Sequence, residues 1–197
     1  MGLRRVNRET TTVRTERLDL VPLAVEHAGE MAGVLDDPAL HTFIGGAPLT
    51  GPELRARYER LVAGSPDPAT VWCNWVVRVR ATGRLAGTVQ ATVTGGGRTA
   101  EVAWVTGTPW QGRGIAREAA GALVALLTER GVRTVVAHVH PDHGASAAVA
   151  HAAGLTPTEE QQDGETRWEL RLRSEEEPAE VSGPAARGGH LPGTEGA

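Results

Sequence analysis

The stretch of residues 101–119 constrains the fold most, because it places a strand, a glycine-containing turn and an amphipathic helix in direct succession. An apolar run predicts a strand over residues 100–106. Apolar residues at helical spacing then predict a helix over about residues 114–130. The next apolar run, residues 134–140, predicts another strand. A strand–helix–strand unit of this kind forms a right-handed crossover, so we expect its two strands to be parallel.

Alternation of apolar and polar residues predicts the other strands, and helical spacing predicts the other helices. We expect strands over residues 17–23, 71–80 and 85–94, a last hairpin that turns at Asp163-Gly164, and helices over residues 24–35, behind Thr50, and over residues 144–153. Thr50 and Glu53 form a capping-box pattern, which marks a helix start. The predicted order β-α-α-β-β-β-α-β-α-β-β defines a mixed α+β fold.

Composition divides the chain into one domain and two flanking segments. Residues 1–14 are polar and Arg-rich and are expected to form a flexible arm, whereas residues 15–173 carry the periodic elements of a single domain. Residues 174–197 are rich in Gly, Pro, Ala and Glu, which predicts a disordered tail. The acids of this tail account for the net charge of −4, so the domain lacks the positive excess of a nucleic-acid-binding surface.

Composition also excludes several classes of protein. The single cysteine, Cys73, cannot form an intrachain disulfide or a thiolate zinc site. No apolar run reaches the roughly 20 residues of a membrane span, and the N-terminus lacks an apolar signal segment. We therefore expect a cytoplasmic protein with no membrane and no nucleic-acid partner. The sequence is compatible with a homodimer.

The turn between the strand and the helix is suited to a phosphate group. Backbone N–H groups at a helix start have no intrahelical acceptor and lie at the positive end of the helix dipole. Gly112 and Gly114 let the backbone approach a ligand closely, and Arg113 adds positive charge. A P-loop is excluded because the chain has no Lys, and a dinucleotide fingerprint is disfavoured because Arg117 stands where its last glycine would be.

The turn resembles the Gln/Arg-x-x-Gly-x-Gly/Ala signature of the GNAT N-acetyltransferases. Residues 15–23, 117–119, 141–146 and 153–155 resemble further segments of the RimJ/RimL-like branch, the ribosomal-protein N-terminal acetyltransferases. The resemblance implies a sheet that splays between the fourth and fifth predicted strands and holds acetyl-CoA in the opening. It places the pantetheine beside Val105 and Thr106. It places the pyrophosphate on the amides of Gln111, Gly112, Arg113, Gly114, Ile115 and Ala116.

Acetyl transfer to an amine requires an acceptor for the amine proton and a donor for the departing thiolate. The resemblance makes Glu101 the candidate base; the alternative is an exposed strand glutamate without a catalytic role. Ala150 stands where many family members have a tyrosine, so Ser146 becomes the candidate acid, with helix capping as the alternative. His143 replaces the usual Asn and is expected to bind the pantetheine amide.

Alternation places His138 and His140 on one strand face, but no cysteine or carboxylate cluster completes a shell, so no metal site is expected. Trp104 is expected in the core. The expected acceptor is a primary amine, of a protein N-terminus or a small molecule, and residues 36–50 are expected to contribute to its recognition. Two other functions stay open: a catalytically inactive acyl-CoA-binding sensor, which would not need Glu101 or Ser146, and an interaction module that binds no CoA.

Overall fold

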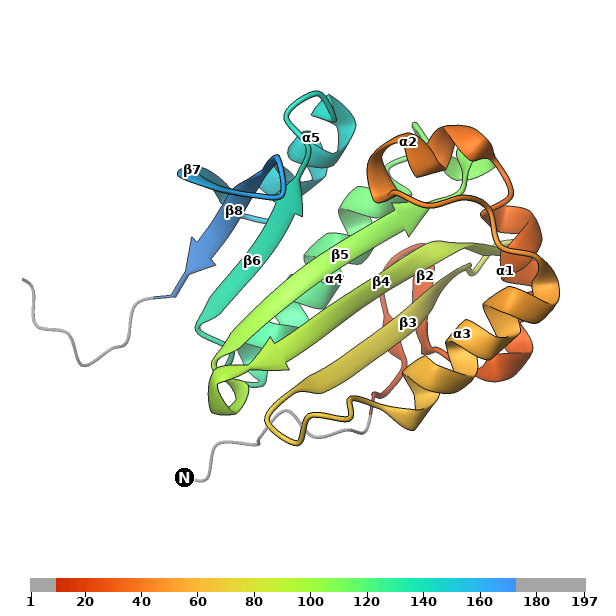
Figure 1. Ribbon diagram of the computed structural model, residues 1–197, viewed down its shortest axis with the longest axis horizontal. Coiled ribbons are helices and arrows are strands. Elements are labelled where there is room, and N and C mark those ends of the chain that lie inside the picture. The colour runs from red at the N-terminus through yellow and green to blue at the C-terminus, as the bar shows by residue number, and fades with distance from the viewer. Residues whose placement is uncertain (1–9, 173–197) are drawn as a thin grey trace, which may run out of the picture.

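An eight-stranded sheet forms the framework of the molecule (Figure 1). The computed structural model describes residues 10–172, so the predicted tail, residues 174–197, lies outside the described residues, as do residues 1–9 of the predicted arm. The strands lie side by side in the order β1-β2-β3-β4-β5-β6-β8-β7. Their bounds are β1 (Val13–Arg14), β2 (Leu18–Pro22), β3 (Val71–Val79), β4 (Leu85–Thr94), β5 (Thr99–Thr106), β6 (Thr134–Val139), β7 (Thr156–Gln162) and β8 (Glu165–Arg171).

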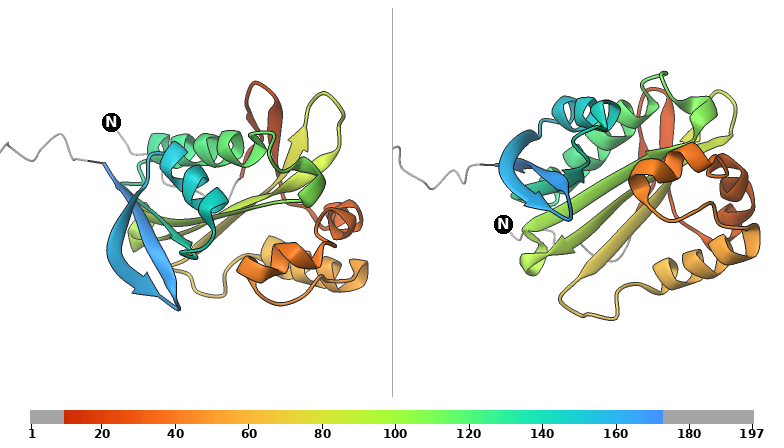
Figure 2. Two further views of the ribbon diagram at one scale, coloured as in Figure 1. Left: turned by 90° about the horizontal axis from the view of Figure 1, so that it is seen from above. Right: turned by 45° about the horizontal axis from the view of Figure 1, so that its top comes forward.

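Helices cover both faces of the sheet. Their bounds are α1 (Ala28–Val34), α2 (His41–Ile44), α3 (Gly51–Ala63), α4 (Ile115–Glu129) and α5 (Gly144–Ala152). Figure 2 shows α4 and α5 on one face and α1, α2 and α3 on the other. The mixed α+β class and the predicted succession of longer elements are confirmed. Across residues 10–172, no helix is both long and apolar enough to cross a membrane.

Two apolar clusters cover the two faces of the sheet. The larger cluster lies under α4, and it completely buries Leu123 and Leu127, each of which contributes about 2 kcal/mol. The smaller cluster joins α1 and α3 to Val76 and Leu85 of the sheet. At the start of α3, a carboxylate oxygen of Glu53 accepts hydrogen bonds from the backbone N–H of Thr50 (2.8 Å) and from its hydroxyl (2.7 Å). The predicted pair therefore does mark this helix start.

The structure adds two short elements that the sequence does not predict. β1 lies at the end of the predicted arm, where Val13 pairs with Leu20 and Arg14 with Asp19. α2 lies within residues 36–50, which show no helical spacing. β1 has only two residues, too few to show alternation, and α2 contacts the distant His140 and His143 through Phe43. Neither element therefore has a local sequence pattern that predicts it.

The sheet opens between β5 and β6. These strands are parallel, as the crossover predicts, but they pair only from Thr99 to Glu101 on β5 and from Thr134 to Val136 on β6. Beyond Glu101 the two strands diverge, and β6 pairs along its whole length with β8 instead (Figure 1). The predicted splay between the fourth and fifth predicted strands is therefore confirmed, and it lies between β5 and β6.

Candidate functional site

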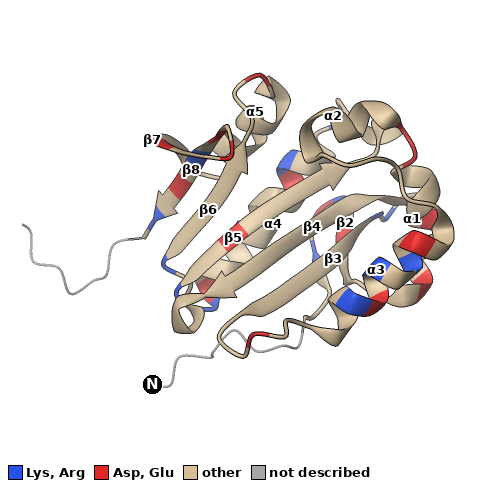
Figure 3. Cartoon of the chain, viewed as in Figure 1, with Lys and Arg blue, Asp and Glu red and all other residues tan. Residues whose placement is uncertain are grey.

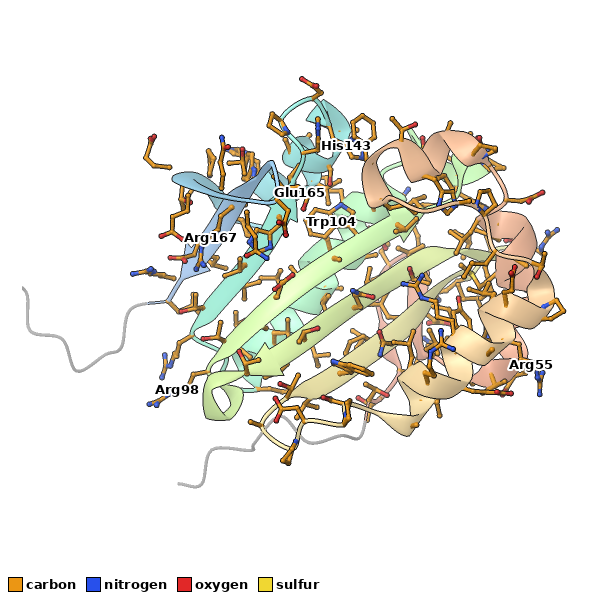
Figure 4. The ribbon with its side chains drawn as sticks, viewed as in Figure 1. Arg55, Arg98, Trp104, His143, Glu165 and Arg167 are labelled. Carbon is orange, nitrogen blue, oxygen red and sulfur yellow. The ribbon has the colours of Figure 1, made fainter. Side chains whose placement is uncertain are left out.

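A cavity of about 480 Å³ lies over the middle strands, bounded by α2, α3 and the start of α5. Its floor carries side chains from β3 to β6, and the residues between α2 and α3 form its roof. Figure 4 shows Trp104, His143 and Glu165 gathered at the open end of β5 and β6. All three residues line the cavity. The opening of the sheet is thus continuous with a space large enough for a small organic group.

The edge of β5 that faces the opening has no partner strand beyond Glu101 within the described chain. Val105 and Thr106 lie on this stretch, and their other edge is held by β4, where Thr106 pairs with Gly87. A Cβ on Gly87 would come within 2.0 Å of the carbonyl oxygen of Val105, so only glycine allows this close approach. One edge of β5 is therefore fixed, and the other is free to pair with an extended ligand.

The turn after β5 is built from positive-φ glycines and one side-chain hydrogen bond. Gly112 (φ 70°) and Gly114 (φ 74°) adopt left-handed conformations that favour glycine. The side-chain amide of Gln111 donates to the carbonyl oxygen of Thr106 at 3.0 Å, which closes the turn. The first hydrogen bond of α4 runs from the N–H of Glu118 to the carbonyl of Gly114. The intervening N–H groups are thus left without an intrahelical acceptor, as expected for a phosphate site.

Arg17 and Glu118 anchor the first turn of α4 to the start of β2. The Glu118 carboxylate accepts from the guanidinium Nε of Arg17 (2.6 Å), from the Arg17 backbone N–H (2.9 Å) and from the Thr15 hydroxyl (2.6 Å). Burial alone would raise the pKa of Glu118, but these hydrogen bonds outweigh it and lower that pKa below its ordinary value. Arg17 also donates to the carbonyl oxygen of Arg113 at 2.9 Å. Sequence reasoning missed this anchor, which joins residues about a hundred positions apart.

Arg113 follows the first glycine of the turn. Its guanidinium carbon lies 5.5 Å from the ring centroid of Trp110, a cation–π distance. This contact holds a positive charge in the turn that precedes α4.

Ser146 lies at the third position of α5, and its hydroxyl oxygen accepts a hydrogen bond from the indole N–H of Trp104 at 3.1 Å. The N-cap residue of α5 is His143, so the alternative in which Ser146 caps this helix is wrong. Trp104 is only partly buried; it packs against the core, as expected, but its polar edge reaches across the opening from β5 to α5. Because the serine oxygen serves as acceptor, its own hydrogen is left to be donated.

Glu101 points from β5 into the same cavity. Figure 3 shows one acidic band on β5, and Glu101 is the only charged residue of that strand. Its carboxylate oxygen lies 3.5 Å from the Nδ1 of His138 on β6. The Glu101 side chain is 59% exposed, whereas that of His138 is 13% exposed. The carboxylate is thus open to a substrate and next to a nearly buried imidazole.

His143 stacks on Phe43 of α2, with ring centroids 4.1 Å apart and an interplanar angle of 18°. Phe43 also meets His140 at 5.6 Å. Burial lowers the pKa of His143, and the neighbouring His140 lowers it further. The ring predicted to bind pantetheine therefore joins α2 to the start of α5 in this structure.

Within residues 10–172, no group of three or more His, Cys, Asp or Glu side chains could hold a metal ion. Cys73 is buried and lies outside the cavity lining. The cavity lining includes two carboxylates, hydroxyls and imidazoles, and the turn after β5 adds backbone amides. These groups can exchange protons and bind an anion.

A family model for the acetyltransferase (GNAT) domain matches residues 17–156 of this chain. The chain belongs to the GNAT acetyltransferase family. No curated protein matches its sequence. In this GNAT domain, the predicted residues Glu101, Val105, His143 and Ser146 line one cavity, whereas the predicted phosphate turn, residues 111–116, lies outside its lining.

Solved GNAT structures share the fold. An acetyltransferase from Agrobacterium tumefaciens str. C58 is 26% identical, with a TM-score of 0.67, and the match covers 87% of this chain and 100% of that one. RimL, a ribosomal L7/L12 alpha-N-protein acetyltransferase in complex with coenzyme A, is 17% identical with a TM-score of 0.69, over 82% and 98% of the two chains. The microcin C7 self immunity acetyltransferase MccE, in complex with acetyl-CoA and AMP, is 16% identical with a TM-score of 0.67, over 80% and 94%.

Proposed function

We propose that this GNAT domain is an N-acetyltransferase that uses acetyl-CoA and acetylates a primary amine, of a protein N-terminus or of a small molecule. The observation that carries the proposal is the continuous path from the unpaired edge of β5 to the free amides at the start of α4. The resemblance of residues 15–23, 117–119, 141–146 and 153–155 to RimJ/RimL-like segments supports that branch of the family. RimL and MccE were solved with coenzyme A and acetyl-CoA, which supports the choice of donor.

The residues present fit the donor. The free edge at Val105 and Thr106 offers backbone groups to an extended pantetheine, as a neighbouring strand would. The left-handed glycines leave room for a pyrophosphate beside the N–H groups of residues 112–116, and Arg113 adds a positive charge. The Gln111 N–H, predicted to join them, instead donates to the carbonyl oxygen of Thr108 at 3.2 Å. When bound, acetyl-CoA supplies an activated thioester.

Glu101 is the proposed proton acceptor for the amine, because it is a cavity carboxylate open to the acceptor side. Ser146 is the proposed proton donor for the departing thiolate. The indole of Trp104 occupies an acceptor site of the Ser146 hydroxyl and leaves its hydrogen available. The part of the cavity that α2 and α3 bound is the proposed acceptor site.

The first experiment is calorimetry of acetyl-CoA binding to the wild type and to Gly114→Glu. The substitution adds bulk and negative charge at the proposed phosphate site, and we expect binding to be lost. Gly83→Glu is the matched control, since Gly83 (φ 68°) has the same backbone strain as Gly114 and open space around it in the β3–β4 hairpin. Circular dichroism checks that all three proteins fold.

Tight binding by the wild type and by Gly83→Glu, with loss in Gly114→Glu, supports the donor site. No binding by the folded wild type would overturn the proposal and favour an interaction module. A sensor is distinguished by Glu101→Gln: an enzyme keeps acetyl-CoA binding and loses transfer to a panel of amines and N-terminal peptides. A wild type that binds acetyl-CoA but acetylates none of this panel would instead favour the acyl-CoA sensor.

A further inference from the structure

The proposed base stands beside a histidine at the point where the sheet opens. Glu101 is the last residue of β5 that pairs with β6, and its partner there is Val136. His138 lies two residues further along β6, so its side chain emerges on the same face as that of Val136, just beyond the last paired residues. The Nδ1 of His138 then lies 3.5 Å from the Glu101 carboxylate. The two side chains meet because the strands separate immediately after them.

Two other basic groups near His138 are engaged elsewhere. Arg167 of β8 pairs with His138 in register, but its guanidinium binds Glu169 and lies 3.5 Å from Glu160. His140, the next residue on this face, accepts the backbone N–H of Asp142 at its Nδ1. Glu165, at the start of β8, also lines the cavity. Among the residues that the structure describes, His138 is the basic group within ion-pair distance of Glu101.

A single exposed carboxylate is a poorly oriented base, because it rotates freely and is solvated by bulk water. An imidazole that is held by the strand and 13% exposed has little such freedom. The 3.5 Å contact is longer than a typical hydrogen bond, and catalytic contacts of this length often tighten in substrate complexes. An N–H donated to one carboxylate oxygen leaves the other oxygen free to face the amine.

We propose that His138 is a positioning residue for Glu101: its Nδ1–H holds the carboxylate toward the acceptor amine. This inference rests on the proposed N-acetyltransferase function. Glu101 takes one proton from the acceptor ammonium, and the neutral nitrogen forms a bond to the thioester carbonyl carbon. The carbon–sulfur bond breaks, its electron pair stays on sulfur, and the thiolate takes the second nitrogen proton by way of Ser146. The proton on Glu101 is then released to water.

The test uses the full-length protein and compares His138→Ala with His138→Asn. The side-chain amide of Asn places an N–H near the position of the imidazole Nδ1, so it restores the donor but not the ring. His151→Asn on the exposed surface of α5 is the matched control. The readout is release of coenzyme A thiol from acetyl-CoA with N-terminal peptides and small amines, as kcat and KM. The lone cysteine is 1% exposed and adds little background.

We expect His138→Ala to lower kcat about 10-fold or more with little change in the acetyl-CoA KM, and His138→Asn to recover part of that loss. Because the two residues act as a unit, Glu101→Gln with His138→Ala should lose no more than Glu101→Gln alone.

Three results would overturn the inference: an unchanged kcat in His138→Ala, no recovery in His138→Asn, or a double variant whose loss is the product of the single losses. Failure of the proposed function looks different, because the wild type would then acetylate none of the amines.

Discussion

Two helices begin at the open end of the sheet, and their first turns are held in different ways. The start of α4 is fixed by left-handed glycines and by the Arg17–Glu118 ion pair, which joins it to the start of β2. The start of α5 is held by side chains that span the opening: Trp104 reaches Ser146, and Phe43 stacks on His143. The first arrangement fixes the backbone of the turn before α4, whereas the second consists of side chains that line the cavity.

The largest loss of stability is expected where β4 packs closely against β5, the strand that leads into the turn before α4. Gly87→Ala puts a Cβ within 2.0 Å of the carbonyl of Val105, so β4 and β5 must separate. We expect a loss of about 3 kcal/mol in the free energy of unfolding, measured with urea. Gly33→Ala in α1, where nothing lies within 4 Å of the added atom, is the control and should be neutral or stabilising. Equal stability of the two variants would show that the close approach of Gly87 to Val105 does not hold β5 in place.

A smaller loss is expected for Glu118→Gln, about 1.5 kcal/mol at neutral pH, since hydrogen bonds to the charged carboxylate are weakened. The pKa of Glu118 in the fold is below its ordinary value of 4.5, so its stabilisation is present above that pH. It is lost as pH falls through the lower folded value. Unfolding of the wild type and the variant should therefore converge in acid, whereas Glu129→Gln, an exposed change at the end of α4, should match the wild type throughout. A difference that persists at low pH would contradict the ion-pair account.

On the α5 side, Trp104→Phe removes the indole donor to Ser146 and keeps a ring in place. We expect about 1 kcal/mol of destabilisation and a fall in kcat that exceeds the change in acetyl-CoA affinity. Trp72→Phe is the control, because the described structure gives the Trp72 indole no hydrogen bond to lose. Turnover that is unchanged in Trp104→Phe would remove the basis for Ser146 as the proton donor.

The smallest change in stability is expected for Phe43→Ala, about 0.5 kcal/mol, because the stack with His143 involves a short and partly exposed helix. The amine KM should rise several-fold while acetyl-CoA binding by calorimetry stays the same. Val62→Ala, at an exposed position of α3, should change neither quantity. A matching fall in acetyl-CoA affinity in Phe43→Ala would place α2 on the donor side of the site.

A different contrast, between local spacing and contacts across the sheet, explains how much the sequence could predict. The succession β5–α4–β6, the α3 capping pair and the glycine turn follow from local spacing, and each was expected at nearly its observed bounds. The contacts of Trp104 with Ser146 and of Arg17 with Glu118 join residues 42 and 101 positions apart. Such contacts arise only when the sheet is assembled. For the same reason, the pairing of His138 with Glu101 was missed, although alternation had placed His138 on a defined strand face.

The separation of β5 from β6 also determines how the backbone exchanges hydrogen with solvent. Successive N–H groups along a strand point to opposite edges, so on β5 beyond Glu101 every second amide is protected by β4 and the others face the opening. In deuterated water, the amides that face the opening should exchange quickly in the free protein and slow down once a ligand pairs with this edge. An alternating pattern of protection along one strand would then report both the occupancy and the register of whatever lies beside it.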